Sequence, residues 1–396
     1  MNASSAALLA FSPSQILTFS PSHKKLSTEH FTLDPMPLIE STVACPLHDS
    51  FRVQQIAGMF DVGLAEKLTE RFAVEIPGVD EPWQIGLIVG PSGSGKSCIA
   101  RATFGESLYQ AGEWPRDRAV IDGLGDAPIK QLTSLLTSVG FGSPPAWLRP
   151  YHVLSGGEKF RCDLARALCQ GARSGLVVFD EFTSVVDRTA ARCGAAALAK
   201  ALRGGLLNVR FVAVTCHYDV ARWLGPDWVT DMASGVCRRR RLRRPELRIE
   251  VYRARREAWR LFGRHHYLSG SLAPGARCYV ASWDGQPIAF CATLAQVGHR
   301  RTWRVTRLVT LPDFQGIGIG SKLLQCVAEL HIAGGDRLLI TSSHPAVLSH
   351  CARSPRWRLR RVYKHGRRPQ RVRNGWYRGS WGRATASFEY VGRFPV

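Results

Sequence analysis

Residues 90–97 read Gly90-Pro91-Ser92-Gly93-Ser94-Gly95-Lys96-Ser97. The apolar run at residues 83–89 predicts a strand before this stretch, and residues 96–110 predict a helix after it. Glycines allow successive backbone N–H groups to point into one loop at the positive end of a helix, which binds phosphate oxygens. Lys96 would reach the outer phosphates of a nucleotide, and Ser97 would hold Mg²⁺. We therefore expect a nucleotide-binding loop here.

A second apolar strand is predicted at residues 176–179, and it ends in two acids, Asp180 and Glu181. Alone, such a pair is usually solvated surface. Beside a phosphate loop, Asp180 would hold the metal through water and Glu181 would polarise an attacking water. A helix predicted at 190–202 and a strand at 209–215 continue an alternation typical of a parallel α/β sheet. Strands are also expected at 51–56 and 72–76.

The motif Leu154-Ser155-Gly156-Gly157-Glu158, before a helix predicted at 159–169, resembles the signature of ABC ATPases. In the same family order, Asp187 resembles the D-loop and His217, after a strand, resembles the switch histidine. The resemblance covers about residues 50–235. It implies ATP as the nucleotide, Glu181 and His217 as catalytic residues, and ATP contacts from the phosphate loop and from Ser155, Gly156, Gly157, Glu158 and Asp187.

The same resemblance implies a head-to-tail pair, because ATP would lie between the phosphate loop of one copy and the signature of another. The second copy would be a homodimer partner or another ABC ATPase subunit. Ser97 and Leu154 are only 57 positions apart, which is short for a transporter ATPase, and Gln131 is the one candidate for the Q-loop. Since transporters dock their membrane partners on this segment, the shortening argues against a transporter subunit.

A second glycine-rich stretch, Gln315-Gly316-Ile317-Gly318-Ile319-Gly320, lies between a strand predicted at 303–311 and a helix predicted at 318–331. Its N–H groups could again bind a pyrophosphate. A dinucleotide-binding fingerprint is the alternative, but the acidic residue that a Rossmann unit carries further on is not at the right place. The stretch is therefore a poor match to a dinucleotide-binding fingerprint.

The spacing of Gln315, Gly318 and Gly320 resembles the GNAT superfamily of N-acetyltransferases, over roughly residues 246–395. The resemblance implies acetyl-CoA or another acyl-CoA as donor. Its pyrophosphate would lie on the glycine-rich stretch, and its pantetheine arm along a strand. The strand residues implied are Leu308, Val309 and Thr310.

The residues that act on the acyl acceptor are not identified by the motifs, and several candidates exist. Many GNAT enzymes have a general-acid tyrosine in a helix where this chain has residues 344–351, which include no tyrosine. Ser349 or His350 could replace it, water could protonate the thiolate, or the segment is an ordinary helix surface. His266 and Tyr267 are candidates for a base and an orienting hydroxyl, or for a packed turn. They also resemble the His-Tyr element of phage Mom-type relatives that modify DNA bases.

Charge divides the chain in two. The net charge is +22, yet residues 1–237 carry 21 Lys and Arg against 23 Asp and Glu, whereas residues 238–396 carry 32 against 8. Arginines interleave with aromatic residues from Arg356 to Trp381, a pattern that suits nucleic acid. An acidic protein, the phosphates of CoA, or an Arg preference from a GC-rich genome are the alternatives.

Composition sets the remaining limits. A chain of 396 residues predicts two or three domains, and 45% hydrophobic residues exclude wholesale disorder. Eleven cysteines without a C-x-x-C pair predict reduced thiols and a cytoplasmic protein. We expect no transmembrane segment and no secretory signal.

We therefore predict the fold class α/β, with a P-loop NTPase of ABC type followed by a GNAT-like α/β acyltransferase. The expected divisions are a disordered segment at 1–45, the ATPase at 46–237, a basic linker at 238–245 and the transferase at 246–396. Within the last we expect a helix at 245–262, a hairpin of 278–283 and 287–294 turning at Asp284-Gly285, and strands at 337–341 and 384–391.

The predicted function is an ATPase coupled to an acyl-CoA-dependent N-acyltransferase that acts on or near nucleic acid. The alternatives are an ATP-switched nucleic-acid-binding module with a non-catalytic GNAT fold, and the ATP-binding subunit of an ABC transporter.

Overall fold

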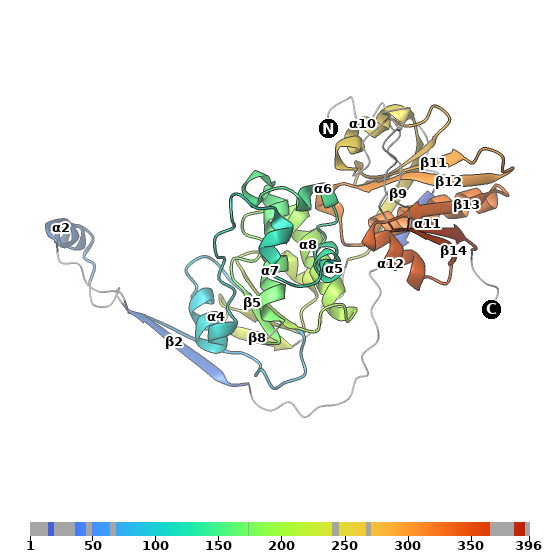
Figure 1. Cartoon of the computed structure of the whole chain (residues 1–396). Helices are drawn as coiled ribbons and strands as arrows, with labels where there is room; N and C mark the ends of the chain where they lie inside the picture. Colours follow the sequence, from blue (N-terminus) through green and yellow to red (C-terminus); the bar gives the residue numbers. More distant parts are fainter. Residues whose placement is uncertain are drawn as a thin grey trace.

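A computed structural model describes residues 15–19, 36–44, 50–63, 69–172, 174–239, 245–266, 271–364 and 384–392, and every structural statement below concerns these residues. They form two α/β units, each built on its own sheet, and a separate pair of strands (Figure 1). The predicted α/β fold class is confirmed.

The first sheet has five strands in the order β5-β6-β4-β7-β8. All five residues of β4 (Ile85–Val89) are buried, as its continuous apolar sequence predicts. β4 runs parallel to β6 (Arg210–Thr215) and β7 (Trp228–Asp231), and β5 (Leu176–Phe179) runs parallel to β6. β8 (Val236–Arg239) is antiparallel to β7. The strand that precedes the phosphate loop is therefore central.

Helices and short 3-10 turns connect these strands. The helices are α4 (Lys96–Phe104), α5 (Ile129–Ser138), α6 (Pro144–Trp147), α7 (Gly156–Gly171), α8 (Arg188–Arg203) and α9 (Val220–Leu224). The 3-10 turns are η2 (Gly105–Ser107), η3 (Val120–Leu124) and η4 (Tyr151–Val153). Small residues allow α8 to pack closely, since a Cβ added at Gly194 would lie 2.8 Å from the ring of Phe160.

The second sheet has eight strands in the order β1-β9-β10-β11-β12-β13-β15-β14. Its strands are β1 (Gln15–Phe19), β9 (Leu247–Ala254), β10 (Arg277–Trp283), β11 (Gln286–Ala295), β12 (Thr302–Thr310), β13 (Arg337–Ser342), β14 (Trp357–Lys364) and β15 (Ala384–Tyr390). Its helical elements are η5 (Arg256–Ala258), α10 (Trp259–Phe262), η6 (Gly263–His265), η7 (Pro312–Phe314), α11 (Ile319–Ala333) and α12 (Pro345–Arg353). Only β12 and β13 pair in parallel among these described strands.

Two predicted elements have the wrong secondary structure. Residues 51–56, predicted as a strand, belong to α2 (Phe51–Phe60), where Ser50 Oγ accepts a hydrogen bond from Val53 N at 3.3 Å and caps the helix. Residues 245–262, predicted as one helix, begin with strand β9. Its apolar residues alternate with charged ones, and this period of two places Leu247, Ile249 and Val251 on the buried face.

The expectation of disorder over residues 1–45 is wrong for two strands. β1 pairs with β9, so that Gln15 lies opposite Val251, and β2 (Leu38–Ala44) pairs with β3 (Thr69–Glu75). The partner of β1 is more than 200 positions away, so local composition does not reveal the pairing. α2 lies beyond the β2–β3 pair, away from both sheets (Figure 1).

Other predictions agree more closely. The β10–β11 hairpin turns at Asp284 and Gly285, whose φ angles are 48° and 75°, as a two-residue turn with left-handed residues requires. The helix predicted at 96–110 is shorter, because it ends at Phe104 before Gly105, whose φ is 40°.

The two α/β units share one buried apolar cluster. At their boundary the ring of Trp223 in α9 lies 5.9 Å from that of Trp283 in β10, and Trp283 in turn lies 6.0 Å from Phe314. The units therefore pack against each other through apolar side chains. Within the described residues, no helix is both long and apolar enough to span a membrane.

Candidate functional site

The phosphate loop lies between β4 and α4, as predicted. Gly93 and Gly95 have φ angles of 79° and 77°, which other residues rarely adopt, and a Cβ at Gly95 would lie 2.4 Å from the ring of Phe72. Lys96 Nζ donates a hydrogen bond to Pro91 O at 2.6 Å, so its side chain turns back across the loop. The loop thus places the N-terminus of α4 and the ammonium group of Lys96 together, and both favour an anion.

The paired acids lie at the end of β5, in the same parallel sheet. Asp180 Oδ1 accepts a hydrogen bond from Glu181 N at 2.8 Å, and Ser184 Oγ donates to Glu181 Oε2 at 2.5 Å. Glu181 and Thr183 both have positive φ angles, 52° and 69°. Such strain in residues other than glycine concentrates at functional sites, where the surrounding structure enforces it.

The donor set fits magnesium. The hydroxyl of Ser97 at the start of α4 and the carboxylate of Asp180 at the end of β5 lie at the same edge of the sheet, because β4 and β5 are both parallel to β6. The described residues contain no cluster of three His, Cys, Asp or Glu side chains that would hold a metal alone. Mg²⁺ commonly takes one or two protein oxygens and completes its shell with phosphate and water.

The signature forms the start of α7. Ser155 Oγ accepts from Glu158 N at 3.3 Å, and Glu158 Oε2 accepts from Ser155 N at 3.0 Å, which is a capping box. Asp187 caps α8 in a similar way, accepting from Thr189 N and Ala190 N. The carboxylates of Glu158 and Asp187 therefore stabilise helix starts.

The structure does not bring all of the predicted ATP residues together. His217 N donates to Thr215 Oγ1 at 3.2 Å just beyond β6. Among the described hydrogen bonds, none joins the phosphate loop to the signature. Ser155 and Gly156 are exposed, as residues that serve a second copy would be, and Gln131 is exposed on α5.

The second predicted site lies where two strands of the larger sheet diverge. β12 and β13 pair from Thr302 opposite Arg337 to Val305 opposite Ile340, and β12 then continues to Thr310. A cavity of about 720 Å³ opens at this fork. Most of the predicted acyl-CoA residues line it: Leu308, Val309, Thr310, Gln315, Gly316, Gly318, Ile319 and Gly320. The side chain of Ile317 is instead buried in the core.

The glycine-rich loop leads directly into α11. Gly318 has a φ of 104° and occupies the N-cap of this helix, and a Cβ at Gly320 would lie 2.9 Å from Thr310 Oγ1. The first backbone N–H groups of a helix have no partner within it. These groups and the open part of β12 therefore border the same cavity.

The first unit forms one wall of this cavity. Ser134, Thr137 and Ser138 from α5 and Lys200 and Arg203 from α8 line it. The contact between the units is close, because a Cβ at Gly316, whose φ is 86°, would lie 2.5 Å from Ala197 Cβ. Gln315 Oε1 accepts from Gly142 N of the first unit at 2.7 Å.

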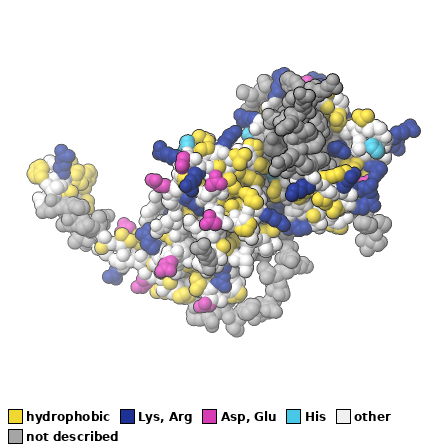
Figure 2. All heavy atoms as spheres, viewed as in Figure 1, with side chains coloured by type: hydrophobic (Ala, Val, Ile, Leu, Met, Phe, Trp, Pro, Cys, Tyr) yellow, Lys and Arg dark blue, Asp and Glu magenta, His cyan; other side chains and the backbone are white. Residues whose placement is uncertain are grey.

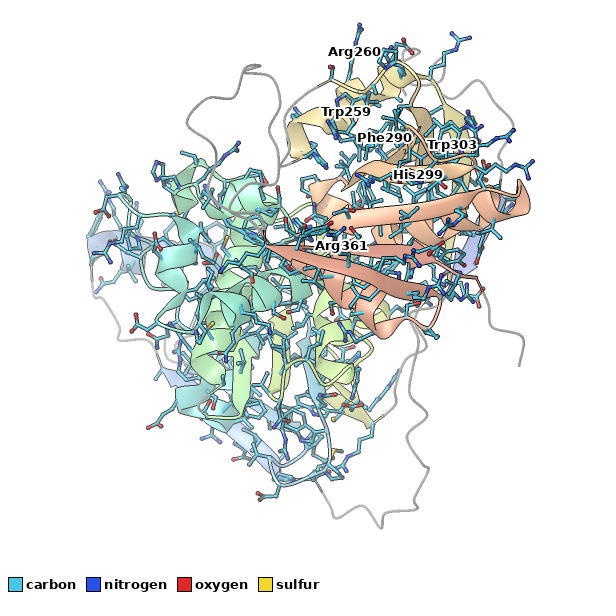
Figure 3. The ribbon with its side chains drawn as sticks, turned by 45° about the vertical axis from the view of Figure 1, so that its right-hand side comes forward. Trp259, Arg260, Phe290, His299, Trp303 and Arg361 are labelled. Carbon is cyan, nitrogen blue, oxygen red and sulfur yellow. The ribbon has the colours of Figure 1, made fainter. Side chains whose placement is uncertain are left out.

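Histidines lie around the cavity. His265 and His266 line it, and the ring of His266 lies edge-on to Trp259, with 5.8 Å between ring centroids. Figure 3 shows Trp259 next to Phe290 in this part of the second unit. Burial, followed by the charge of Arg264, lowers the pKa of His265. Tyr267 lies outside the described residues, so its role stays a prediction.

α12 carries the segment that lacks the expected tyrosine. His350 lines the cavity, and its pKa is lowered by burial and by the charges of Lys200, Lys322 and Arg353. Ser349 Oγ accepts a hydrogen bond from Arg353. His344 Nε2 lies 2.9 Å from Gly142 O, a second polar contact between the units.

An ion pair between a buried arginine and a half-exposed aspartate connects the signature helix with η7. The side chain of Arg161 on α7 is 1% exposed, and its Nη1 lies 3.7 Å from Asp313 Oδ1. Burial raises the pKa of Asp313, the charges of Asp187 and Glu158 add to this, and Arg161 opposes it. A Cβ at Gly157 would lie 3.1 Å from Asp313 Oδ1. Elements predicted to contact ATP therefore lie beside the loop that leads to the cavity.

Basic side chains concentrate on the second unit. In Figure 2 the acids gather over the first unit, whereas Lys and Arg dominate the charged groups of the second. On the edge strand β14, Arg358 and Arg360 pair with Glu389, and Arg361 lies over the ring of Tyr363. The rest of the arginine-rich segment, residues 365–383, lies outside the described residues.

Residues 274–355 match the family of acetyltransferase (GNAT) domains, so the GNAT expectation is confirmed for this part of the chain. The chain is similar to a dimeric ATP-binding cassette, MJ0796, in a post-hydrolysis state bound to ADP and Pi, with 16% identity and a TM-score of 0.36 over 52% of this chain and 99% of that chain. It is also similar to an IAA acetyltransferase from Bacillus cereus, with 17% identity and a TM-score of 0.26 over 36% and 98% of the two chains.

A third similar structure is the ribosomal-protein-S18-alanine N-acetyltransferase from Escherichia coli, with 13% identity and a TM-score of 0.29 over 36% of this chain and 92% of that chain. A search of curated protein sequences finds no match.

Sequence reasoning missed the residues that the first unit contributes to the cavity. Lys200 and Gly316 are 116 positions apart, and Gly142 and Gln315 are 173 apart. Lys200 and Gly142, the partners from the first unit, belong to no motif with a spacing that could be recognised. Only the packing of the two units reveals them.

Proposed function

We propose that this protein is an ATP-hydrolysing P-loop ATPase of ABC type joined to an acyl-CoA-dependent N-acyltransferase of GNAT type. The observation that carries the proposal is the cavity at the fork of β12 and β13. The two strands of this fork lie within the segment that matches GNAT domains, and a glycine-rich helix N-terminus borders the cavity.

In the transferase half, the open edge of β12 from Leu308 to Thr310 would hydrogen-bond the pantetheine arm. The N–H groups at the start of α11 would bind the pyrophosphate. An acceptor amine would attack the thioester carbonyl, so that a C–N bond forms and the C–S bond breaks. His266 would take the proton that the amine loses, and His350 or water would protonate the departing thiolate.

In the ATPase half, Lys96 and the loop N–H groups would hold the β- and γ-phosphates. Ser97 and Asp180 would hold Mg²⁺, which supplies charge neutralisation at the phosphates. Glu181 would orient and polarise the attacking water, and His217 would contact the γ-phosphate. Ser155 and Gly157 would complete the site of a second copy, so the proposed active form is a homodimer or a pair with another ABC ATPase subunit.

Calorimetry with acetyl-CoA and a steady-state ATP hydrolysis assay test the two halves separately. We expect binding of acetyl-CoA by the full chain, and release of free CoA thiol when a suitable amine is added. A chain that hydrolyses ATP but binds no acetyl-CoA would instead be the ATP-switched module with a non-catalytic GNAT fold.

Nucleic acid is the second candidate ligand, and the exposed basic strand β14 is the observation that favours it. Fluorescence anisotropy with a labelled 20-mer DNA at two salt concentrations tests it, because phosphate contacts make affinity fall steeply with salt. If the acceptor is a base, as the Mom-type likeness implies, nucleoside mass spectrometry of DNA from expressing cells would show an added acyl group. Affinity that does not change with salt would contradict phosphate contacts.

A further inference from the structure

We propose that the acyl-CoA site is completed by the ATPase half, with Lys200 of α8 binding a phosphate group of the coenzyme. This inference rests on the proposed acyl-CoA binding and adds to it a ligand from outside the GNAT fold.

The position of Lys200 is the first support. Its Nζ lies 3.4 Å from Gly316 O, and a Cβ at Gly318 would lie 3.4 Å from the same nitrogen. The ammonium group thus lies over the loop that leads into α11. Lys200 is exposed and lines the cavity at this point.

The electrostatics of this position favour an anion. The N-terminus of a helix carries a partial positive charge, which repels a cation placed beside it. Lys200 brings a full positive charge to the start of α11, and an anion between the two would turn the repulsion into two attractions. A phosphate oxygen can accept hydrogen bonds from both the ammonium and the backbone N–H groups.

Further cations gather at the same end of the cavity. Arg353 of α12 lines it beside His350, and burial together with the charges of Lys200, Lys322 and Arg353 lowers the pKa of His350. No acidic side chain lines the cavity among the described residues. Lys200 of α8, Lys322 of α11 and Arg353 of α12 therefore bring positive charge to this end of the cavity, and no acidic side chain of the lining offsets it. This charge suits a ligand with several phosphates.

The size of the cavity agrees with a coenzyme. Its volume of about 720 Å³ lies within the usual range for cofactor sites, roughly 300–1,000 Å³. One end of the cavity is the fork of β12 and β13, which would receive the thioester. The glycine-rich loop lines the cavity as well, and so do residues of α5 and α8. The wall supplies the hydroxyls of Ser134, Thr137 and Ser138 as well as Lys200.

Calorimetry with acetyl-CoA on the full-length chain tests this. Lys200→Met should weaken binding roughly ten- to hundredfold, the loss expected for one charge-assisted hydrogen bond. Lys200→Arg should retain the affinity within a few fold, because the charge is kept. The matched control is Lys130→Met, which removes an exposed lysine of α5 outside the cavity and should leave the affinity unchanged.

A parallel titration with 3′-dephospho-acetyl-CoA identifies the phosphate group. If Lys200→Met weakens both ligands equally, Lys200 binds the pyrophosphate; if it weakens only acetyl-CoA, Lys200 binds the 3′-phosphate. An affinity of Lys200→Met within twofold of the wild type would overturn the inference and leave the proposed function intact. An equal loss in Lys200→Arg would also overturn it, since packing rather than charge would then be responsible. A wild-type chain that binds no acetyl-CoA would overturn both proposals.

Discussion

Gln315 Oε1 accepts a hydrogen bond from Gly142 N at 2.7 Å, and Gln315 Nε2 donates to Thr310 O at 2.9 Å. One side chain of the predicted acyl-CoA motif therefore connects the first α/β unit, the glycine-rich loop and the end of β12. The resemblance to GNAT enzymes implied a role for Gln315 in binding the coenzyme. Its observed contacts indicate that it also holds the two halves together.

Gln315→Ala should destabilise the interface by about 1–2 kcal/mol, because Gly142 N loses its partner in a half-buried position. For units of this size we expect the melting temperature to fall by roughly 2–8 °C. Differential scanning calorimetry measures this, with Gln131→Ala on the exposed face of α5 as control. Equal melting temperatures in the two variants would show that the contact does not stabilise the interface.

Gly316→Ala should disrupt the interface more strongly. The new Cβ would lie 2.5 Å from Ala197 Cβ and 2.8 Å from Gly140 Cα, and the φ of 86° would be strained as well. We expect a loss of roughly 2–4 kcal/mol and weaker acetyl-CoA binding. Gly298→Ala is the matched control, since Gly298 has a similar φ of 79° with nothing within 4 Å of the added Cβ.

In the Gly298 variant the free energy of unfolding should fall only by the cost of the strained backbone, about 1 kcal/mol. Thermal unfolding of both variants separates strain from packing. A Gly316→Ala chain as stable as Gly298→Ala would mean that the loop moves away from α8 at little cost.

ATP hydrolysis should depend on Lys96 and Glu181 in different ways. Lys96→Ala removes the cation of the phosphate loop, so ATP binding should be lost. Glu181→Gln should retain ATP binding while turnover falls roughly 10²–10⁴-fold, the usual contribution of a general base. A coupled ATPase assay and nucleotide binding by equilibrium dialysis measure the two effects, with Lys130→Ala as control. Wild-type turnover in the Glu181 variant would remove that residue from the mechanism.

The stability of the second sheet should fall in acid through Glu389. Burial alone would raise the pKa of Glu389, but hydrogen bonds from Arg337 and Arg358 and the charge of Arg360 lower it below its ordinary value of 4.5. A lowered folded-state pKa stabilises the protein above the ordinary pKa, and this contribution is lost as the pH falls through the folded-state pKa. Stability should therefore decline below about pH 4.5.

Glu389→Gln should cost about 2 kcal/mol at pH 7, because three arginines lose their shared carboxylate. It should also flatten the decline between pH 5 and pH 3, relative to wild type. Urea unfolding at a series of pH values measures both effects. The control Glu70→Gln, on the exposed face of β3, should change neither; the same decline in Glu389→Gln and wild type would assign the acid sensitivity to other groups.

Both glycine-rich loops were predictable because their chemistry is local. A strand, a loop with left-handed glycines and a helix start are consecutive in the chain, so the motif and its geometry coincide at Gly95 and again at Gly318. The turn at Asp284-Gly285 was predictable for the same reason. Residues 245–262 were misassigned because the segment was treated as one element. Residues 247–254 alternate with the period of a strand and pair with β1 and β10, and helical structure begins only at Arg256.

Local residue patterns, together with the family resemblances that they carry, were therefore sufficient to predict two α/β units, a phosphate loop and a GNAT-type loop, since each motif is contained in a short stretch of the chain. The tertiary structure alone shows that α8 forms a wall of the second cavity and places Lys200 over the second loop. It also shows that Arg161, after the signature, is buried against Asp313. These contacts join residues more than a hundred positions apart. They result from the packing of apolar faces, and the sequence of one apolar face does not identify the face against which it packs.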